Sequence, residues 1–220
     1  MFKLFVITHP EKIDNESHVI NALFNEGLEC LHLRKPNAGI DTLEAYIKNI
    51  KPEFINRVVI HHHYSLIERY NLKGVHLTSM FYEALSREVL VENINLLHKH
   101  GMTVSASLHS MEELRNMKQD FDYIFISPIF DSISKPNHKS AWSKKEITEY
   151  MRCYASRSKI IGLGGINAEN IHEVYSMGLH GAALLGSIWS KPKDAVKNYL
   201  AIHSEVIKLN HTKTSLIEKE

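Results

Sequence analysis

The chain has 220 residues, of which 26 are Lys or Arg and 25 are Asp or Glu, so its formal net charge is +1. This balance excludes a general nucleic-acid-binding protein, which needs a basic surface to displace counterions from phosphates. No apolar window is long enough for a membrane span, and the first apolar run is too short for a signal peptide, so we expect a cytoplasmic protein with no membrane partner. Two cysteines are too few for a disulfide scaffold, whereas 15 histidines are unusually many.

Short β-rich runs alternate with longer amphipathic runs along the chain. The expected strands are, in order, Phe2–Thr8, Leu28–Arg34, Arg57–His61, Gly74–Leu77, Met102–Ser107, Phe121–Ile126, Lys159–Leu163 and Gly181–Leu185. The expected helices are Ser17–Asn25, Asp41–Ile50, Leu66–Tyr70, Arg87–His100, Met111–Lys118, Lys144–Ala155, Ala168–Met177 and Asp194–Leu209.

Several helices carry terminal signals. Ser17 and Asp41 are expected as N-caps, and Ser143 stands three residues before Glu146, which is the spacing of a capping box. A glycine follows three of the helical runs, as expected at a helix C-terminus: Gly27, Gly101 and Gly178.

These alternating units predict an α/β fold, and eight of them favour a (β/α)₈ TIM barrel with eight parallel strands over an open doubly wound sheet. We expect one barrel domain over residues 1–207 and a frayed C-terminal tail over residues 208–220. An exposed helix face could pair two barrels into a homodimer.

Polar residues alternate with aliphatic ones along several strands. In the second strand Cys30, His32 and Arg34 share one face, which we expect to point into the barrel, while Leu31 and Leu33 face the helices. Inward polar residues near the carboxyl ends of barrel strands are typical of an active site. Five histidines are expected near this mouth: His32, His61, His63, His76 and His109. For each of them the alternative is a hydrogen-bonded core histidine.

Two glycine elements follow the last two strands. Gly164 and Gly165 follow the seventh strand, and Gly186 and Ser187 follow the eighth. Glycines let a phosphate approach the backbone, and N–H groups at a helix start complement its charge, so we expect a phosphate site here. The alternative is a pair of tight turns that need positive φ.

Cationic and hydroxyl side chains are also expected at the mouth. The sixth loop offers Ser132, Ser134 and Lys135 to an anionic substrate, although a solvated surface loop would read the same way. Arg34 on the inward face needs an anionic or strongly accepting partner.

Several motifs together resemble a known family. They are Arg34-Lys35-Pro36, Gly74-Val75-His76-Leu77, Ser107-Leu108-His109, Ser127 to Lys135, and Gly164-Gly165-Ile166. In order and spacing, over roughly residues 2–200, they resemble the thiamine phosphate synthases and their sister group, the TenI-type thiazole tautomerases. The resemblance implies a (β/α)₈ barrel that acts on the thiazole phosphate half of thiamine.

Departures from the synthase pattern gather where that family binds Mg²⁺. His61 and His62 stand at the family's Asn-Asp, Phe81 stands at a further metal-binding Asp, and Pro36 replaces a lysine that helps hold pyrophosphate. Mg²⁺ prefers carboxylate oxygens, which neither imidazole nor a phenyl ring replaces. The resemblance therefore favours a metal-independent, tautomerase-like enzyme without a cofactor, with Mg²⁺ needed only if synthase activity is retained.

The substrate implied is a small phosphorylated thiazole. The residues expected to serve it are His109, His32 and Lys135 in catalysis, Arg34, Ser107, Ser132, Ser134 and His61 in substrate binding, and Gly164, Gly165, Gly186 and Ser187 in phosphate binding. A tautomerase places a second catalytic histidine in the sixth loop, where this chain has Pro128.

Three alternatives stay open. One is a thiamine phosphate synthase that joins hydroxymethylpyrimidine diphosphate and thiazole phosphate, and another is a protein that binds thiazole or thiamine phosphate without turnover. The third is a zinc or nickel hydrolase, because His61 and His63 have the His-x-His spacing of metal ligands. The expected inward faces carry no carboxylate to serve such a hydrolase.

Overall fold

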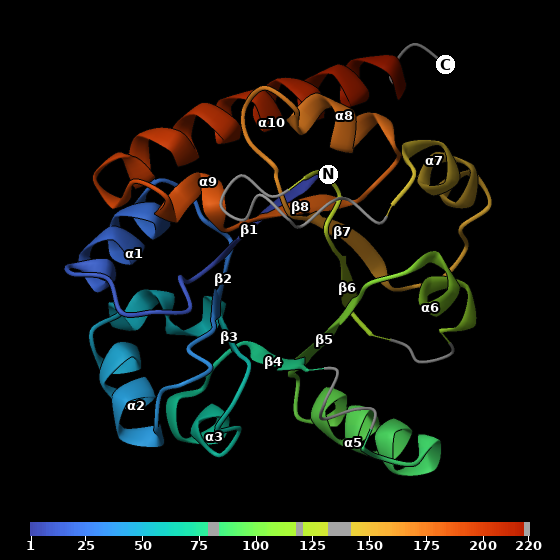
Figure 1. Cartoon of the computed structure of the whole chain (residues 1–220). Coiled ribbons are helices and arrows are strands. Elements are labelled where there is room, and N and C mark those ends of the chain that lie inside the picture. The colour runs from blue at the N-terminus through green and yellow to red at the C-terminus, as the bar shows by residue number, and fades with distance from the viewer. Residues whose placement is uncertain (79–83, 118–120, 132–141, 218–220) are drawn as a thin grey trace.

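A computed structural model describes residues 1–78, 84–117, 121–131 and 142–217, with side chains up to residue 212. Parallel strands form a closed barrel in the order β1 to β8 (Figure 1). The strands are β1 (Lys3–Ile7), β2 (Cys30–Leu33), β3 (Val58–Ile60), β4 (Gly74–Leu77), β5 (Thr103–Leu108), β6 (Tyr123–Ile126), β7 (Lys159–Leu163) and β8 (Gly181–Leu184). The prediction of a parallel eight-stranded (β/α)₈ barrel is confirmed.

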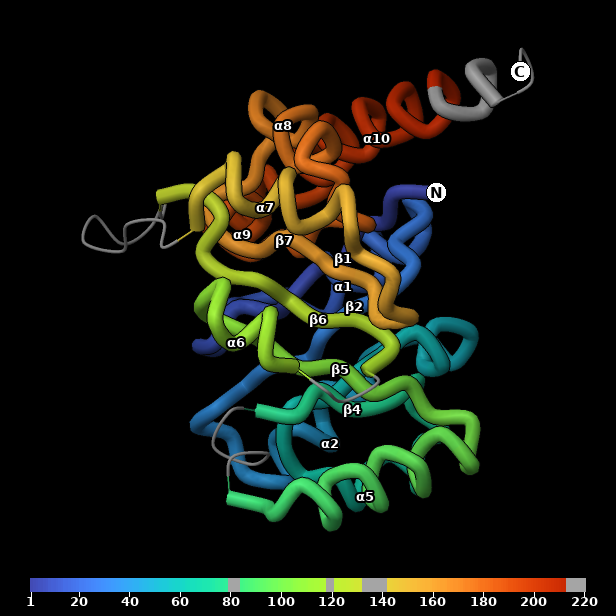
Figure 2. Tube along the Cα trace, turned by 90° about the vertical axis from the view of Figure 1, so that its right-hand side faces the viewer, coloured from blue at the N-terminus to red at the C-terminus, as the bar shows by residue number. Residues whose placement is uncertain are grey.

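Helices surround the barrel, with α5 on the side opposite α8 and α10 (Figures 1 and 2). They are α1 (Glu16–Asn25), α2 (Ile40–Lys48), α3 (Leu66–Tyr70), α5 (Arg87–Lys99), α6 (Met111–Asn116), α7 (Lys144–Arg152), α8 (Ile171–Ser176), α9 (Gly186–Trp189) and α10 (Ala195–Ile217). Short 3₁₀ helices cover Pro52–Arg57 and Pro192–Asp194. The last helix continues past residue 207, where we placed the domain boundary; that boundary stays a prediction.

Helix ends follow the sequence signals in part. Ser143 caps α7 by accepting a hydrogen bond from the backbone N–H of Glu146, as expected. The prediction of Ser17 and Asp41 as N-caps is wrong. The N-cap residue of α1 is Asn15 and that of α2 is Gly39, and neither forms a side-chain capping hydrogen bond. The glycines that follow α1, α5 and α8 all have positive φ, which confirms them as helix-terminating residues: Gly27, Gly101 and Gly178.

Two apolar clusters fill the fold on the two faces of the sheet. The larger one lies between strands and helices and includes Leu31 and Leu33 of β2. The smaller one fills the barrel and consists of Phe5, Ile7, Cys30, Val59, Tyr123, Phe125, Ile161 and Ala183. The strand alternation therefore has the expected sense, with the aliphatic face of β2 outward and the Cys30 and His32 face inward. Among the described residues no helix is both long enough and apolar enough to cross a membrane.

Candidate active site at the carboxyl ends of the strands

Three buried histidines form a compact group inside the barrel, the histidine cluster: His32 on β2, His61 directly after β3 and His76 on β4. Each is 3% exposed or less. His32 Nδ1 lies 3.0 Å from His61 Nε2, and the rings of His61 and His76 stack with centroids 4.3 Å apart. Because strand alternation turns all three side chains inward, three neighbouring strands bring them together.

Hydroxyl groups surround the cluster. The register sets His76 of β4 opposite Ser105 of β5, and Ser105 opposite Tyr123 of β6. Tyr123 Oη lies 2.7 Å from His32 Nε2. Ser105 donates to the carbonyl of Val75 over 3.2 Å, so it accepts from His76 Nδ1, 3.0 Å away. The network thus leaves His76 Nε2 to accept from the hydroxyl of Ser107, at 3.0 Å.

The cluster is uncharged at neutral pH. Burial lowers the pKa of His32 and of His61 well below the ordinary histidine value, and that of His76 to about 3. The positive charge of Arg34 lowers the pKa of His61 and of His76 further. An isolated charge on any of these rings would be costly in the barrel interior.

Arg34 lies at the mouth, immediately after β2, on a firmly held backbone. The hydroxyl of Thr8 accepts from the Arg34 N–H over 2.8 Å and donates to the Arg34 carbonyl over 3.0 Å. The Arg34 side chain is half-buried, and its positive charge contributes to lowering the pKa of His61, His62 and His76.

Lys35, the next residue, points elsewhere. Its ammonium is buried, lies 2.5 Å from Glu16 Oε2, and also donates to the carbonyls of His9 and Glu11. It further lies 4.7 Å from the centre of the Tyr46 ring. Lys35 therefore cannot stand in for the synthase lysine whose place is taken by Pro36.

His109 lies at the end of β5 and is exposed to solvent. Its Nδ1 lies 3.2 Å from the carbonyl of Ser127, which can only accept, so in the neutral form of the ring Nδ1 carries the proton and Nε2 keeps a lone pair. Its backbone N–H donates to Glu113 Oε2 over 2.8 Å, and Ser110 caps α6 through the N–H of Glu113. This capping arrangement holds a base-competent imidazole at the mouth.

The loops that follow β7 and β8 begin side by side, because the two strands are paired in parallel. Within the described chain, no hydrogen bond uses the backbone N–H groups of Gly165, Ile166, Gly186 or Ser187. The Ser187 hydroxyl is buried and likewise has no hydrogen-bond partner among the described groups. These donors suit a tetrahedral anion such as a phosphate ester.

The glycine pair also has a packing role, which was the alternative explanation. Gly164 and Gly165 have φ of +101° and +67°. A Cβ on Gly165 would lie 2.6 Å from the carbonyl oxygen of Asp131, and one on Gly164 would lie 2.9 Å from Pro128 Cα. The loop after β6 is thus closely packed on the glycine loop.

We expect Gly165→Ala to destabilise the protein by about 2–4 kcal/mol, because a β-carbon adds backbone strain at positive φ and a contact with a carbonyl that cannot move cheaply. Gly101→Ala is the matched control: its φ is +72°, yet a Cβ there meets nothing within 4 Å. It should cost only about 1–2 kcal/mol. Urea unfolding measures both, and equal losses would contradict the close-packing argument.

The described donors do not fit the Mg²⁺ that the family resemblance implies. His61 and His62 supply nitrogen in place of the synthase carboxylate and amide oxygens, and the charged or titratable groups acting on His61 are His76, His32, Arg34 and His62. None is a carboxylate, whereas Mg²⁺ prefers oxygen ligands. We therefore assign no step to Mg²⁺ here.

Some expected site residues are not brought together. Ser132, Ser134 and Lys135, like Phe81, lie outside the described residues. His63 turns away from the histidine cluster: its Nε2 lies 3.0 Å from the carbonyl of Ala38, so it forms no His-x-His pair with His61. The predicted pairing of His61 with His63, which supported a zinc or nickel hydrolase, is therefore wrong, because His63 does not join His61. His32 is inside the barrel, but its complete burial keeps it from direct contact with a substrate at the mouth.

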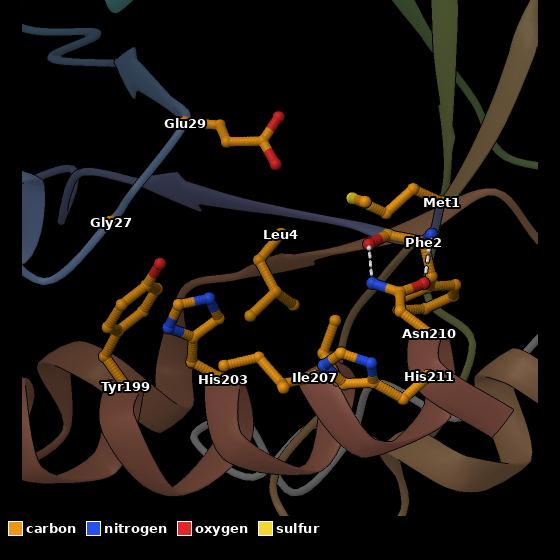
Figure 3. Close-up of a pocket in the computed structure, with 11 residues that line it drawn as sticks. Met1, Phe2, Leu4, Gly27, Glu29, Tyr199, His203, Ile207, Asn210 and His211 are labelled. Atoms are coloured by element: carbon orange, nitrogen blue, oxygen red, sulfur yellow. Dashed lines mark hydrogen bonds between the residues drawn. The ribbon is translucent and has the colours of Figure 1, made fainter. Parts of the chain in front are cut away.

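A separate apolar cavity lies at the other end of the strands, between the start of β1 and α10 (Figure 3). Leu4, Tyr199, His203 and Ile207 line it, and Asn210 closes it through two hydrogen bonds to the backbone of Phe2. Glu29 and His211 also line this cavity, but it lies at the amino ends of the strands, away from the mouth, so it is not the candidate active site (Figure 3).

Sequence reasoning missed Tyr123 and Thr8. Tyr123 alternates with Ile124 along β6, and this alternation could have placed its hydroxyl inside the barrel. The contact of Thr8 with Arg34 depends on the pairing of β1 with β2, which no local pattern encodes.

Known proteins resemble the chain along most of its length. The family described as thiamine monophosphate synthase matches residues 4–188. A solved thiamine phosphate pyrophosphorylase from Bacteroides thetaiotaomicron superimposes with a TM-score of 0.74 and is 31% identical, covering 92% of this chain and 96% of its own.

Sequence relatives carry the same kind of name. The thiamine-phosphate synthase of Clostridium acetobutylicum is 24% identical over 96% of this chain and 98% of its own length. The match to the Listeria welshimeri thiamine-phosphate synthase is 35% identical but spans only 42% of that protein.

Proposed function

Because the chain belongs to the thiamine monophosphate synthase family, we propose that it is an enzyme that acts on a phosphorylated thiazole at the mouth of the barrel. The proposed reaction is a tautomerase-like proton shift that makes the thiazole ring aromatic without Mg²⁺. The choice of reaction depends on the imidazoles of His61 and His62, which stand where the family resemblance implies oxygen ligands for Mg²⁺. It is supported by His109, whose neutral ring would keep a lone pair on Nε2 at the end of β5.

Each group at the mouth has a task in this proposal. The N–H groups of Gly165, Ile166, Gly186 and Ser187 bind the ester phosphate, and Arg34 binds the carboxylate of the substrate. The Gly164 and Gly165 turn allows the close approach of the phosphate.

Proton transfer falls to His109. Its Nε2 lone pair removes a proton from the substrate, and the imidazolium then returns a proton at the second position, so the oxidation state does not change. Ser107, half-buried beside the mouth, orients the ring through its hydroxyl. His32 acts at most through this hydrogen-bond network, because its burial separates it from the substrate.

A thiamine phosphate synthase is the second candidate. The names of relatives that align over nearly the full length favour it. It would need another way to stabilise the departing pyrophosphate, because the cation at position 36 is replaced by proline and the oxygen ligands by histidines.

The test is to incubate the chelator-treated protein with the thiazole carboxylate phosphate, and separately with thiazole phosphate plus hydroxymethylpyrimidine diphosphate, each with and without Mg²⁺. Proton NMR detects the aromatic tautomer, and mass spectrometry detects thiamine phosphate. We expect the tautomer in chelator. Thiamine phosphate formed only with Mg²⁺ would establish the synthase instead, and tight calorimetric binding without any product would indicate a non-catalytic binding protein.

A further inference from the structure

The histidine cluster has the geometry of a three-imidazole metal site. One ring nitrogen each from His32, His61 and His76 lie within 4.8 Å of one another. A tetrahedral Zn²⁺ bound at about 2.0–2.1 Å needs ligand nitrogens somewhat over 3 Å apart. The observed 3.0 Å between His32 Nδ1 and His61 Nε2 is close to this spacing, so small rotations of the side chains would admit an ion.

The outward-facing nitrogens of two of these rings are already oriented by hydrogen bonds. His32 Nε2 lies 2.7 Å from the hydroxyl of Tyr123, and His76 Nδ1 lies 3.0 Å from that of Ser105, which is itself fixed on the carbonyl of Val75. Ligating histidines almost always have such a partner on the second nitrogen, which fixes the tautomer. Of the remaining nitrogens, His32 Nδ1 lies 3.0 Å from His61 Nε2, and His76 Nε2 lies 3.0 Å from the hydroxyl of Ser107, which a metal would have to displace from that nitrogen.

The chemical state of the cluster also suits a metal. A metal binds neutral imidazole, and burial keeps all three rings neutral by lowering their pKa values. Nitrogen ligands without a carboxylate favour Zn²⁺ and its neighbours over Mg²⁺. Arg34 acts against a bare dication, so an anion such as hydroxide or phosphate on the open position would complete the site.

We propose that His32, His61 and His76 bind a borderline transition-metal dication of the Zn²⁺ class inside the barrel, through His32 Nδ1, His61 Nε2 and His76 Nε2, the last of which exchanges its contact with Ser107 for the metal, and that the fourth, open position takes a further ligand. This inference does not rest on the proposed reaction, because it concerns the buried side chains and is tested by metal binding. The alternative is a metal-free hydrogen-bond network with the same partners.

The test uses full-length protein made without a histidine tag, stripped with chelator and then titrated with Zn²⁺ or Co²⁺. We expect one tightly held ion per chain after gel filtration, measured by elemental analysis. The Co²⁺ form should show the intense visible absorption of a low-coordinate site with nitrogen ligands. No retained ion, or only the weak absorption of octahedral Co²⁺, would overturn the proposal.

Three variants locate the ion. His61→Asn should abolish retention of Zn²⁺, and His63→Asn, two residues along the same loop and bonded to Ala38, should leave it unchanged. Tyr123→Phe keeps the ring and removes only the hydroxyl, so it should weaken Zn²⁺ binding by about 10–100-fold. If His61→Asn does not fold, Tyr123→Phe still decides. Equal binding by wild type, Tyr123→Phe and any folded His61→Asn would overturn the assignment.

Discussion

We expect mild acidification to destabilise the metal-free protein, with the unfolding free energy falling by about 2–3 kcal/mol between pH 7 and pH 4.5 through His76 alone, and further through His32 and His61. The cause is the histidine cluster. In the folded barrel the pKa of His76 is about 3, and the pKa values of His32 and His61 are also well below the ordinary one. In the unfolded chain each would titrate near its ordinary value of about 6.5.

The sign follows from proton uptake. Above about pH 7 neither state protonates these rings, and their contribution to stability is intact. As the pH falls below 6.5 the unfolded state protonates these rings, while burial opposes their protonation in the folded state. Stability is therefore lost by about 1.4 kcal/mol per pH unit for His76, whose folded pKa is about 3, and the lowered pKa values of His32 and His61 add to this loss. The contribution of His76 is already a large fraction of the marginal stability of a domain.

Urea unfolding at pH 7.5, 6.0, 5.0 and 4.5, in the presence of chelator, measures this effect. His61→Asn removes one of the three groups and should therefore make the loss smaller. His100→Ala, at an exposed histidine, should leave the pH profile unchanged. An unfolding free energy that is flat from pH 7.5 to pH 5.0 would contradict the buried, neutral state of the cluster.

The second large effect is expected at His109. His109→Ala should lower the tautomerisation rate by about 10²–10⁴-fold, which is the usual contribution of a general acid–base group. The variant should fold normally, because the side chain is exposed and its backbone bond to Glu113 is retained. The rate is measured at saturating substrate by proton NMR of the aromatic product.

Two controls separate catalysis from binding. Affinity for inorganic phosphate, measured by calorimetry, should not change in His109→Ala, because the phosphate donors lie on other loops. The control variant His100→Ala should keep the full rate. A His109→Ala protein with undiminished turnover would remove the acid–base role from this residue.

The barrel was predictable because eight short β-rich runs alternate with amphipathic helical runs along the chain, and several strands also carry an alternation of polar and aliphatic residues. In β2, for example, one face carries Cys30 and His32 and points into the barrel. The other face carries Leu31 and Leu33 and packs against the helices. Helix starts were less predictable: α1 and α2 begin one residue before the serine and aspartate that we expected as caps, since tertiary contacts fix where the chain turns.

The inward direction of some candidate side chains was predictable from the sequence, but the way the histidines group together was not. The inward positions of His32 and His76 followed from strand alternation, and the capping spacing around Ser110 is visible in the sequence. That His63 points away from His61 could not be predicted. His63 adopts a φ of +55° in a turn, where the two-residue alternation of a strand no longer applies.

The buried pair of Lys35 and Glu16 has a consequence for affinity. Because this ion pair anchors the segment after β2 to the loop before α1, and Thr8 clamps the neighbouring peptide, the chain at Arg34 is already ordered before any ligand arrives. Little conformational entropy remains to be lost there on association. The backbone that carries Arg34 is thus preorganised, so the proposed binding of an anion by this residue would require no rearrangement of the main chain.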